Sequence, residues 1–266
     1  MVEMFNQCSR RAALKLATSI GSIAFLNSHN VYSQNSMPTA RQQQLTAADG
    51  HKFTIYRAEP PGPSKGGIVI LHAVYGLTTN MGDVCATWAQ AGYTAVAPAL
   101  FDRIKLNTVH PYTREGVQAG TDGYNALTEA QIFADIAACV ASAGGEARTA
   151  ISGFCTGGSW AWRAASKMNF AAHVNFYGSH VHTKDYINLE PRSKTIIHYG
   201  DRDGVVPIAE IERIRARHPN VEISIYPGAG HAFLNPDQQS YHAASAQPAW
   251  ARSIAFMDTH VGLKKS

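Results

Sequence analysis

The sequence predicts an α/β fold in which helices flank a mostly parallel central sheet within a single domain. Short apolar runs of β-forming residues alternate with helical segments, and the connections between them are short, which is typical of parallel sheets. The chain of 266 residues is 45% hydrophobic and only 16% charged, enough for one large core. Residues 67–71, Gly-Ile-Val-Ile-Leu, have the unbroken apolar character of a strand buried on both faces.

The elements follow one another along the chain as this fold requires. Apolar runs bounded by turn residues predict strands at residues 52–57, 67–71, 93–97, 147–152, 172–176, 195–199 and 222–226. Helical patterns predict helices at residues 81–91, 124–142, from 158 onward, 208–217 and about 248–260. We expect an irregular insertion at residues 104–123.

The N-terminal residues differ in character from this body. Ser9-Arg10-Arg11 followed by a mildly apolar stretch predicts a twin-arginine-type export signal over residues 1–33 and a periplasmic product. An uncleaved membrane anchor and a misplaced start codon are the alternatives. Residues 34–45, which include three consecutive glutamines, are expected to be a polar lead-in without structure. The folded domain then covers residues 46–262.

The net charge and the lengths of the apolar runs limit the classes of partner that we expect. The formal net charge is only +4 and the basic residues are scattered, so neither a nucleic-acid footprint nor a polybasic membrane patch is visible. No stretch after residue 30 approaches the roughly 18 to 20 consecutive apolar residues of a membrane-spanning helix. We therefore expect no nucleic-acid partner and no stable membrane association after signal removal.

The number and positions of the cysteines indicate that Cys155 differs from the others. Loss of Cys8 with the signal leaves Cys85, Cys139 and Cys155, an odd number for an oxidising compartment. Cys85 and Cys139 fall in predicted helices and are expected to fill the core, although the sequence leaves a disulfide between them open. Export after folding in the reducing cytosol would allow Cys155 to remain a free thiol.

Residues 148–162 join a predicted strand to a predicted helix through a turn that carries Cys155. Gly153 and Gly157 stand two residues before and after the cysteine, as in the G-x-C-x-G form of a nucleophile elbow. The helix that starts behind Cys155 favours its thiolate, and the Thr156 N–H becomes free to face a developing oxyanion. A plain glycine-rich turn with a structural cysteine is the alternative.

Two loops at strand ends supply an acid and a base. Asp203 follows the strand at residues 195–199, and His231 lies in a glycine-rich loop after the strand at 222–226. The order Cys155, Asp203, His231 is that of nucleophile, acid and base in the α/β-hydrolase fold. Asp201 is the alternative acid; the position of Asp203 four residues before Pro207 favours Asp203.

This constellation predicts acyl transfer. His231 would take the thiol proton, Asp203 would orient the imidazole, and the thiolate would form a thioester that water hydrolyses. The loop after residues 67–71 should supply a second oxyanion donor, the N–H of Val74. His180 and His182 are the one candidate metal pair, but no Cys, Asp or Glu cluster accompanies them, so we expect no metal.

Four motifs give the chain a resemblance to the dienelactone hydrolase family of thiol α/β-hydrolases, over about residues 46–260. They are G-F-C-T-G-G at 153–158, G-D-R-D-G-V-V-P at 200–207, G-A-G-H-A-F at 228–233 and A-G-Y-T-A-V-A-P-A-L-F-D-R at 91–103. The resemblance implies hydrolysis of a small lactone or ester without a metal or organic cofactor, by a monomer. It also implies that Arg103 binds the substrate carboxylate.

Two positions depart from the pattern of that family. Ala73 stands where the family usually has a glutamate that helps to activate the cysteine, and Asn235 replaces a second carboxylate-binding arginine. The first change favours a resting thiolate and imidazolium pair, and the second favours a changed substrate. A carboxylesterase of other specificity and a non-catalytic thiol sensor are the rival functions.

Overall fold

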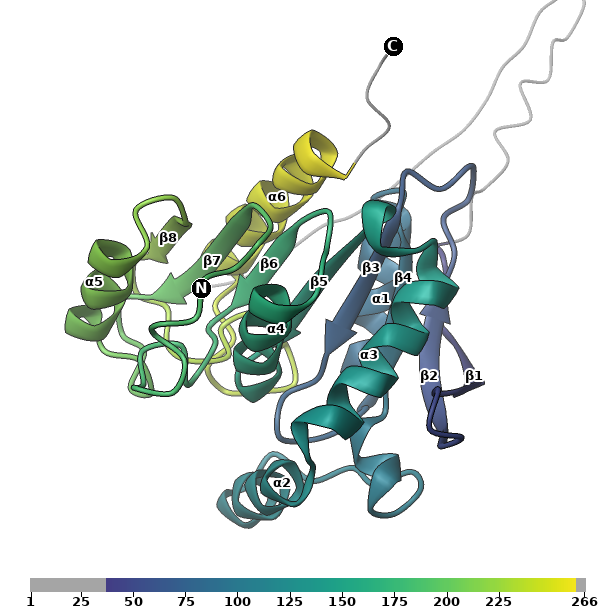
Figure 1. Cartoon of the computed structure of the whole chain (residues 1–266). Coiled ribbons are helices and arrows are strands. Elements are labelled where there is room, and N and C mark those ends of the chain that lie inside the picture. The colour runs from purple at the N-terminus through teal and green to yellow at the C-terminus, as the bar shows by residue number, and fades with distance from the viewer. Residues whose placement is uncertain (1–36, 262–266) are drawn as a thin grey trace, which may run out of the picture. The chain divides into compact units, whose positions relative to one another are not determined.

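An eight-stranded sheet forms the centre of the molecule, and helices cover its two faces (Figure 1). The computed structural model describes residues 37–261, and the predicted export signal at residues 1–33 lies outside them, as do residue 262 of the predicted domain and the first residues of the predicted lead-in. The strand order is β1-β2-β4-β3-β5-β6-β7-β8. The strands are β1 (Arg41–Thr46), β2 (Lys52–Ala58), β3 (Gly67–Leu71), β4 (Thr94–Pro98), β5 (Thr149–Phe154), β6 (His173–Phe176), β7 (Thr195–Gly200) and β8 (Glu222–Tyr226).

The sheet is mostly parallel. Neighbouring strands from β4 through β8 in this order pair in parallel, whereas β2 pairs antiparallel with both β1 and β4. Every residue of β3, β4, β5, β6 and β7 is buried, which explains their apolar character, because parallel strands are covered on both faces. The predicted single-domain α/β fold is thereby confirmed, and all seven predicted strands are present.

The helices form the outer layers. Helices α1 (Thr79–Gln90) and α6 (Ala243–His260) lie on one face of the sheet, and α3 (Glu129–Ala143) and α4 (Thr156–Lys167) lie on the other (Figure 1). The remaining elements are α2 (Arg114–Ala126), α5 (Ile208–Arg217) and the short 3-10 helices η1 (Leu100–Arg103) and η2 (Glu146–Arg148). Cys85 of α1 and Cys139 of α3 belong to different hydrophobic clusters, and both are buried free thiols, so they form no disulfide.

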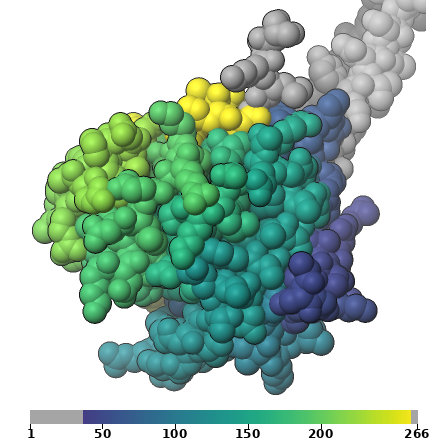
Figure 2. Space-filling view, in the orientation of Figure 1, coloured from purple at the N-terminus to yellow at the C-terminus, as the bar shows by residue number. Residues whose placement is uncertain are grey.

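The prediction of an unstructured lead-in is wrong for residues 41–46, which form strand β1. All six residues pair with β2, but almost all of their side chains are exposed. Figure 2 shows this purple N-terminal part at the surface. An edge strand with no buried face leaves no alternation of apolar and polar residues, so only its backbone pairing marks it as a strand.

The helix predicted at residues 124–142 is in fact two helices. Leu127 is extended, and Thr128 caps α3 in a capping box with Gln131, which ends α2 and starts α3 in a new direction. The part of the predicted irregular insertion from Arg114 onward is therefore helical. No single described helix could span a membrane by length and composition; α2 and α3 reach that threshold only as a pair bent by 93°.

The last helix begins at Ala243, five residues before the predicted start. The prediction treated Pro248 as the first helical position, where proline is common. The residues before it, Ala-Ala-Ser-Ala-Gln, include good helix formers, and Pro248 removes only one backbone hydrogen bond within the helix.

Candidate active site

Cys155 occupies a sharp turn between β5 and α4, as the nucleophile-elbow prediction requires. Its backbone has φ 54° and ψ −120°, a conformation that few residues other than glycine adopt. A Cβ atom on Gly153 would lie 2.3 Å from the carbonyl oxygen of Gly157, so no side chain fits there. Strain of this kind persists only where the surroundings hold it, and it places the thiol above the carboxyl edge of the sheet.

His231 and Asp203 meet from separate loops. The Nδ1 atom of His231 lies 2.8 Å from Oδ2 of Asp203, whose side chain is fully buried. The other oxygen of Asp203 accepts the N–H groups of Val205 and Val206, which fixes the carboxylate. Asp201, the alternative acid, instead accepts the N–H of Gly228. The structure therefore brings Asp203, and not Asp201, to the imidazole.

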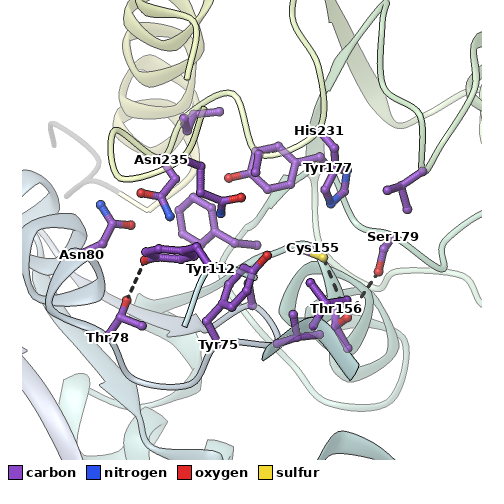
Figure 3. A pocket seen from close by; sticks show the side chains of 18 of the residues that line it. Tyr75, Thr78, Asn80, Tyr112, Cys155, Thr156, Tyr177, Ser179, His231 and Asn235 are labelled. Carbon is purple, nitrogen blue, oxygen red and sulfur yellow. Dashed lines mark hydrogen bonds between the residues drawn. The ribbon is translucent and has the colours of Figure 1, made fainter. Parts of the chain in front are cut away.

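The other ring nitrogen of His231 faces the thiol. Among residues 37–261 it has no hydrogen-bond partner although it is buried, and Figure 3 shows it pointing towards the sulfur of Cys155. Burial raises the pKa of the Cys155 thiol, but the positive charge of His231 and contacts with Thr156 lower it more, to below its ordinary value. Burial lowers the pKa of His231, whereas the Cys155 thiolate and Asp203 raise it, with a net rise to about 10. These opposite shifts favour a resting thiolate and imidazolium pair.

The two predicted oxyanion donors border the same cavity. Thr156 is the first residue of α4, and Val74 lies in the loop after β3. Neither backbone N–H donates to a backbone carbonyl within the described part of the chain, and the Thr156 N–H faces the Cys155 sulfur, which helps to lower the pKa of the thiol. Both are therefore available to a negatively charged oxygen that forms beside Cys155.

The loop that carries Val74 is held by contacts that the sequence reasoning missed. The Nδ1–H of His72 donates to the carbonyl of Ala73 at 2.7 Å, and Nε2 accepts the N–H of Leu100 at 3.3 Å. The hydroxyl of Tyr124 donates to the carbonyl of His72 at 2.6 Å. Burial lowers the pKa of His72 to about 4, so the ring stays neutral and keeps this arrangement. The Ala73 carbonyl and the Val74 N–H belong to one peptide group and point in opposite directions, so His72 orients the donor.

Helix α2 closes against this loop. A Cβ atom on Gly120 would lie 1.7 Å from the carbonyl oxygen of Val74, so only glycine allows the helix to approach so closely. Gly120 lies in the segment that was predicted to be an irregular insertion, and a glycine inside a helix is the one sequence signal for this contact.

A cavity of about 360 Å³ extends from Cys155. Tyrosine, phenylalanine and aliphatic side chains form most of its walls, including Tyr75, Tyr112, Phe154 and Tyr177. Figure 3 shows Cys155 and His231 at one end and Asn80, Asn235 and Tyr112 at the other. We refer to these as the catalytic end and the amide end; the amide end comprises Thr78, Asn80, Tyr112, Asn235 and Gln238.

Comparisons with known proteins decide the family. A model described as the dienelactone hydrolase family matches residues 53–261. The chain belongs to the dienelactone hydrolase family. A protein of Methylorubrum extorquens with the provisional name carboxymethylenebutenolidase is 30% identical, covering 92% of this chain and 90% of its own. One of Escherichia coli K12 with the same provisional name is 29% identical, covering 82% and 86%.

A solved structure gives the same assignment. The crystal structure of a provisionally named dienelactone hydrolase from Klebsiella pneumoniae has a TM-score of 0.73 and 26% identity, covering 83% of this chain and 98% of that one. As a dienelactone hydrolase family member with this fold, the protein is a hydrolase of the carboxylic ester class.

The prediction that Arg103 binds the substrate carboxylate disagrees with the structure of this dienelactone hydrolase family member. Its guanidinium pairs with Asp135 at 2.7 Å and 2.9 Å and with Asp49 at 2.8 Å, and its side chain is only 5% exposed. Arg103 does not line the cavity. The turn of η1 directs it towards α3, where the fully buried Asp135 requires a positive partner.

The two departures from the dienelactone hydrolase pattern both lie at the cavity. Ala73 and Asn235 line it, so the replaced glutamate and arginine would have faced the substrate space. No group of three or more His, Cys, Asp and Glu side chains in residues 37–261 could hold a metal ion, and His180 and His182 belong to none.

Proposed function

We propose that the protein is a cysteine-dependent hydrolase of small esters or lactones that works through a thioester with Cys155. The observation that carries the proposal is the path from Asp203 through His231 to Cys155 at the catalytic end of the cavity. The lowered pKa of the thiol and the raised pKa of the imidazole support it, because the nucleophile is already ionised before substrate binds.

In the first half of the reaction the Cys155 thiolate attacks the carbonyl carbon, and the carbonyl oxygen becomes an oxyanion near the N–H groups of Thr156 and Val74. When the tetrahedral intermediate collapses, the carbon–oxygen ester bond breaks. The imidazolium of His231 gives its proton to the leaving alkoxide, and the acyl group remains on sulfur as a thioester.

In the second half, neutral His231 accepts a proton from water, and the resulting hydroxide attacks the thioester. Collapse of the second intermediate breaks the carbon–sulfur bond, releases the carboxylic acid and restores the thiolate and imidazolium pair. Asp203 keeps the Nδ1 proton of His231 in place throughout and stabilises the charged ring.

The first test is the acyl-enzyme itself. The purified chain is mixed with an activated acetate ester, quenched within a turnover and analysed by intact mass. We expect one added acetyl group that is absent from Cys155→Ala, whose hydrolysis rate falls by about 10⁴-fold or more. Cys85→Ala is the matched control because Cys85 is a buried free thiol of α1, and it should acylate normally. Full hydrolysis by Cys155→Ala would contradict the proposal.

A pair of aspartates separates an enzyme from a thiol sensor, which needs only the thiol. Asp203→Asn should lower kcat by about 10³- to 10⁴-fold, because the amide would force the wrong imidazole tautomer. Asp201→Asn retains an oxygen for the Gly228 N–H and should remain near wild-type activity. Equal activity of the two variants would show that the reaction of the thiol does not need Asp203, which would favour the sensor function.

We also propose that this hydrolysis takes place in the periplasm and that the protein acts as a monomer. Ser9-Arg10-Arg11 and the apolar stretch after it support export. Cell fractionation of the full chain should find the activity in the periplasm, and an Arg10→Lys, Arg11→Lys variant should lose it. Size-exclusion chromatography at several concentrations should give the mass of one chain.

A further inference from the structure

We propose that the substrate is an uncharged ester or lactone that has an apolar body and a neutral hydrogen-bonding group, which binds at the amide end of the cavity. The inference rests on the proposed hydrolysis at Cys155 and concerns what the rest of the cavity selects. It departs from the expectation that Arg103 anchors a carboxylate.

Apart from the Cys155 thiolate and the His231 imidazolium, no charged side chain lines the cavity in the described part of the chain. Among the described residues that line the cavity there is no Asp, Glu, Lys or Arg. The charges of Cys155 and His231 compensate each other, and partial burial together with nearby His182 lowers the pKa of His180 below its ordinary value. A carboxylate that entered would lose its hydration without gaining a cationic partner.

Asp237, a charged group beside the amide end, has the wrong sign to bind a carboxylate. The hydroxyl of Tyr112 lies 3.5 Å from Oδ2 of Asp237, just outside the cavity lining. Arg103, the cation predicted to bind the substrate carboxylate, pairs with Asp135 and Asp49 and does not line the cavity. A carboxylate placed at the amide end would therefore meet the negative charge of Asp237 instead of a cationic partner.

The amide end offers hydrogen bonds instead of charge. The side-chain oxygen of Asn235 accepts the N–H of Asp237 at 2.9 Å, which leaves its NH₂ group free. The side-chain amides of Asn80 and Gln238 make no hydrogen bond to another residue in the described part of the chain. Free amides in a partly buried wall bind hydroxyl, ether, carbonyl or amide groups.

The side chains in the middle of the cavity determine the shape and polarity of the central part of the substrate. Tyr75 and Tyr112 pack edge to face with ring centroids 4.6 Å apart, and Phe154 and Tyr177 complete apolar walls. Such walls bind a flat or aliphatic body between the reacting carbonyl and the distal polar group.

The decisive experiment compares two substrates that differ only in charge: a dienelactone with its free carboxylate and the same dienelactone as its carboxamide. We expect kcat/KM to be about 10- to 100-fold higher for the carboxamide. A factor of this size corresponds to the binding free energy that a carboxylate loses where no arginine pairs with it. Equal rates, or a preference for the carboxylate, would overturn the inference.

Variants of the amide end test the same inference by adding a positive charge to the protein instead of removing the negative charge from the substrate. Asn235→Arg should raise kcat/KM for the carboxylate about 10-fold and lower it for the carboxamide. Asn220→Arg adds the same charge in an exposed turn and should change neither. If Asn235→Arg folds poorly because the Asp237 contact is lost, Gln238→Arg supplies the charge at the same end.

A small activated acetate ester tests the hydrolysis at Cys155 separately from the specificity, because its acetyl group carries no distal polar group for the amide end to bind. Cys155-dependent cleavage of the acetate together with a preference for the carboxylate lactone would remove only the specificity inference. No cleavage of the acetate would remove the proposed hydrolysis and this inference with it.

Discussion

The catalytic end and the amide end of one cavity are built in different ways. Cys155, Asp203 and His231 each follow a parallel strand, so the sheet itself brings them together. The amide end is formed by the start of α1, by Tyr112 before α2 and by the loop after His231. These segments are not fixed by strand pairing, so the sequence of this end can change while the catalytic end is preserved.

Removal of Arg103 tests whether any cation serves the amide end, and it should have the largest effect of the remaining predictions. Arg103→Ala leaves the buried Asp135 without its partner and should lower the free energy of unfolding by about 3 to 5 kcal/mol. Urea unfolding measures this loss. The folded fraction should keep its KM for both lactone forms, because Arg103 does not line the cavity.

A double variant controls for the buried charge. Arg103→Met with Asp135→Leu removes both charges and should recover most of the lost stability. The exposed partner Asp49 contributes little, about 1 kcal/mol or less, so Asp49→Ala should be mild. A rise in KM confined to the carboxylate lactone in Arg103→Ala would return this residue to substrate binding.

The second prediction concerns His72, which we regard as a positioning residue because it acts through the Ala73–Val74 peptide. His72→Leu should lower kcat by roughly 10- to 100-fold with KM little changed, because a misdirected oxyanion donor weakens only the transition state. His72→Asn can keep the donor to the Ala73 carbonyl and should recover part of kcat. Equal falls in kcat for both variants, in step with lost stability, would contradict this role.

The catalytic end could be predicted from the sequence because each residue carries a local signal. Gly153 and Gly157 mark the elbow around Cys155, and the strands before Asp203 and His231 are apolar enough to place their loops at one edge of the sheet. Pairing of the strands then leaves little freedom. A local pattern together with topology was sufficient.

The amide end and the supports of the site lacked such signals. A motif match placed Arg103 near the substrate, but its direction depends on Asp135, which lies 32 positions later and carries no local mark as its partner. The contact of His72 with Leu100 and the approach of Gly120 to Val74 likewise depend on loop paths that periodicity does not describe. Strand β1 was missed for a related reason, since its exposed side chains carry no pattern.

The last prediction tests whether the ionisation of Cys155 and His231 is independent of the residues at the amide end. The pKa of Cys155 is lowered and that of His231 is raised to about 10, so the ion pair exists at pH values between the two. Alkylation of Cys155 by iodoacetamide should therefore persist below the usual thiol pKa and decline only as the thiolate takes up a proton. His231→Gln removes the positive charge and leaves the burial that raises the thiol pKa, so its alkylation at pH 7 should be roughly 10-fold slower or more. Asn235→Leu, which alters only the amide end, should leave the pH profile unchanged; a shifted profile in that variant would show that the two ends are electrostatically coupled.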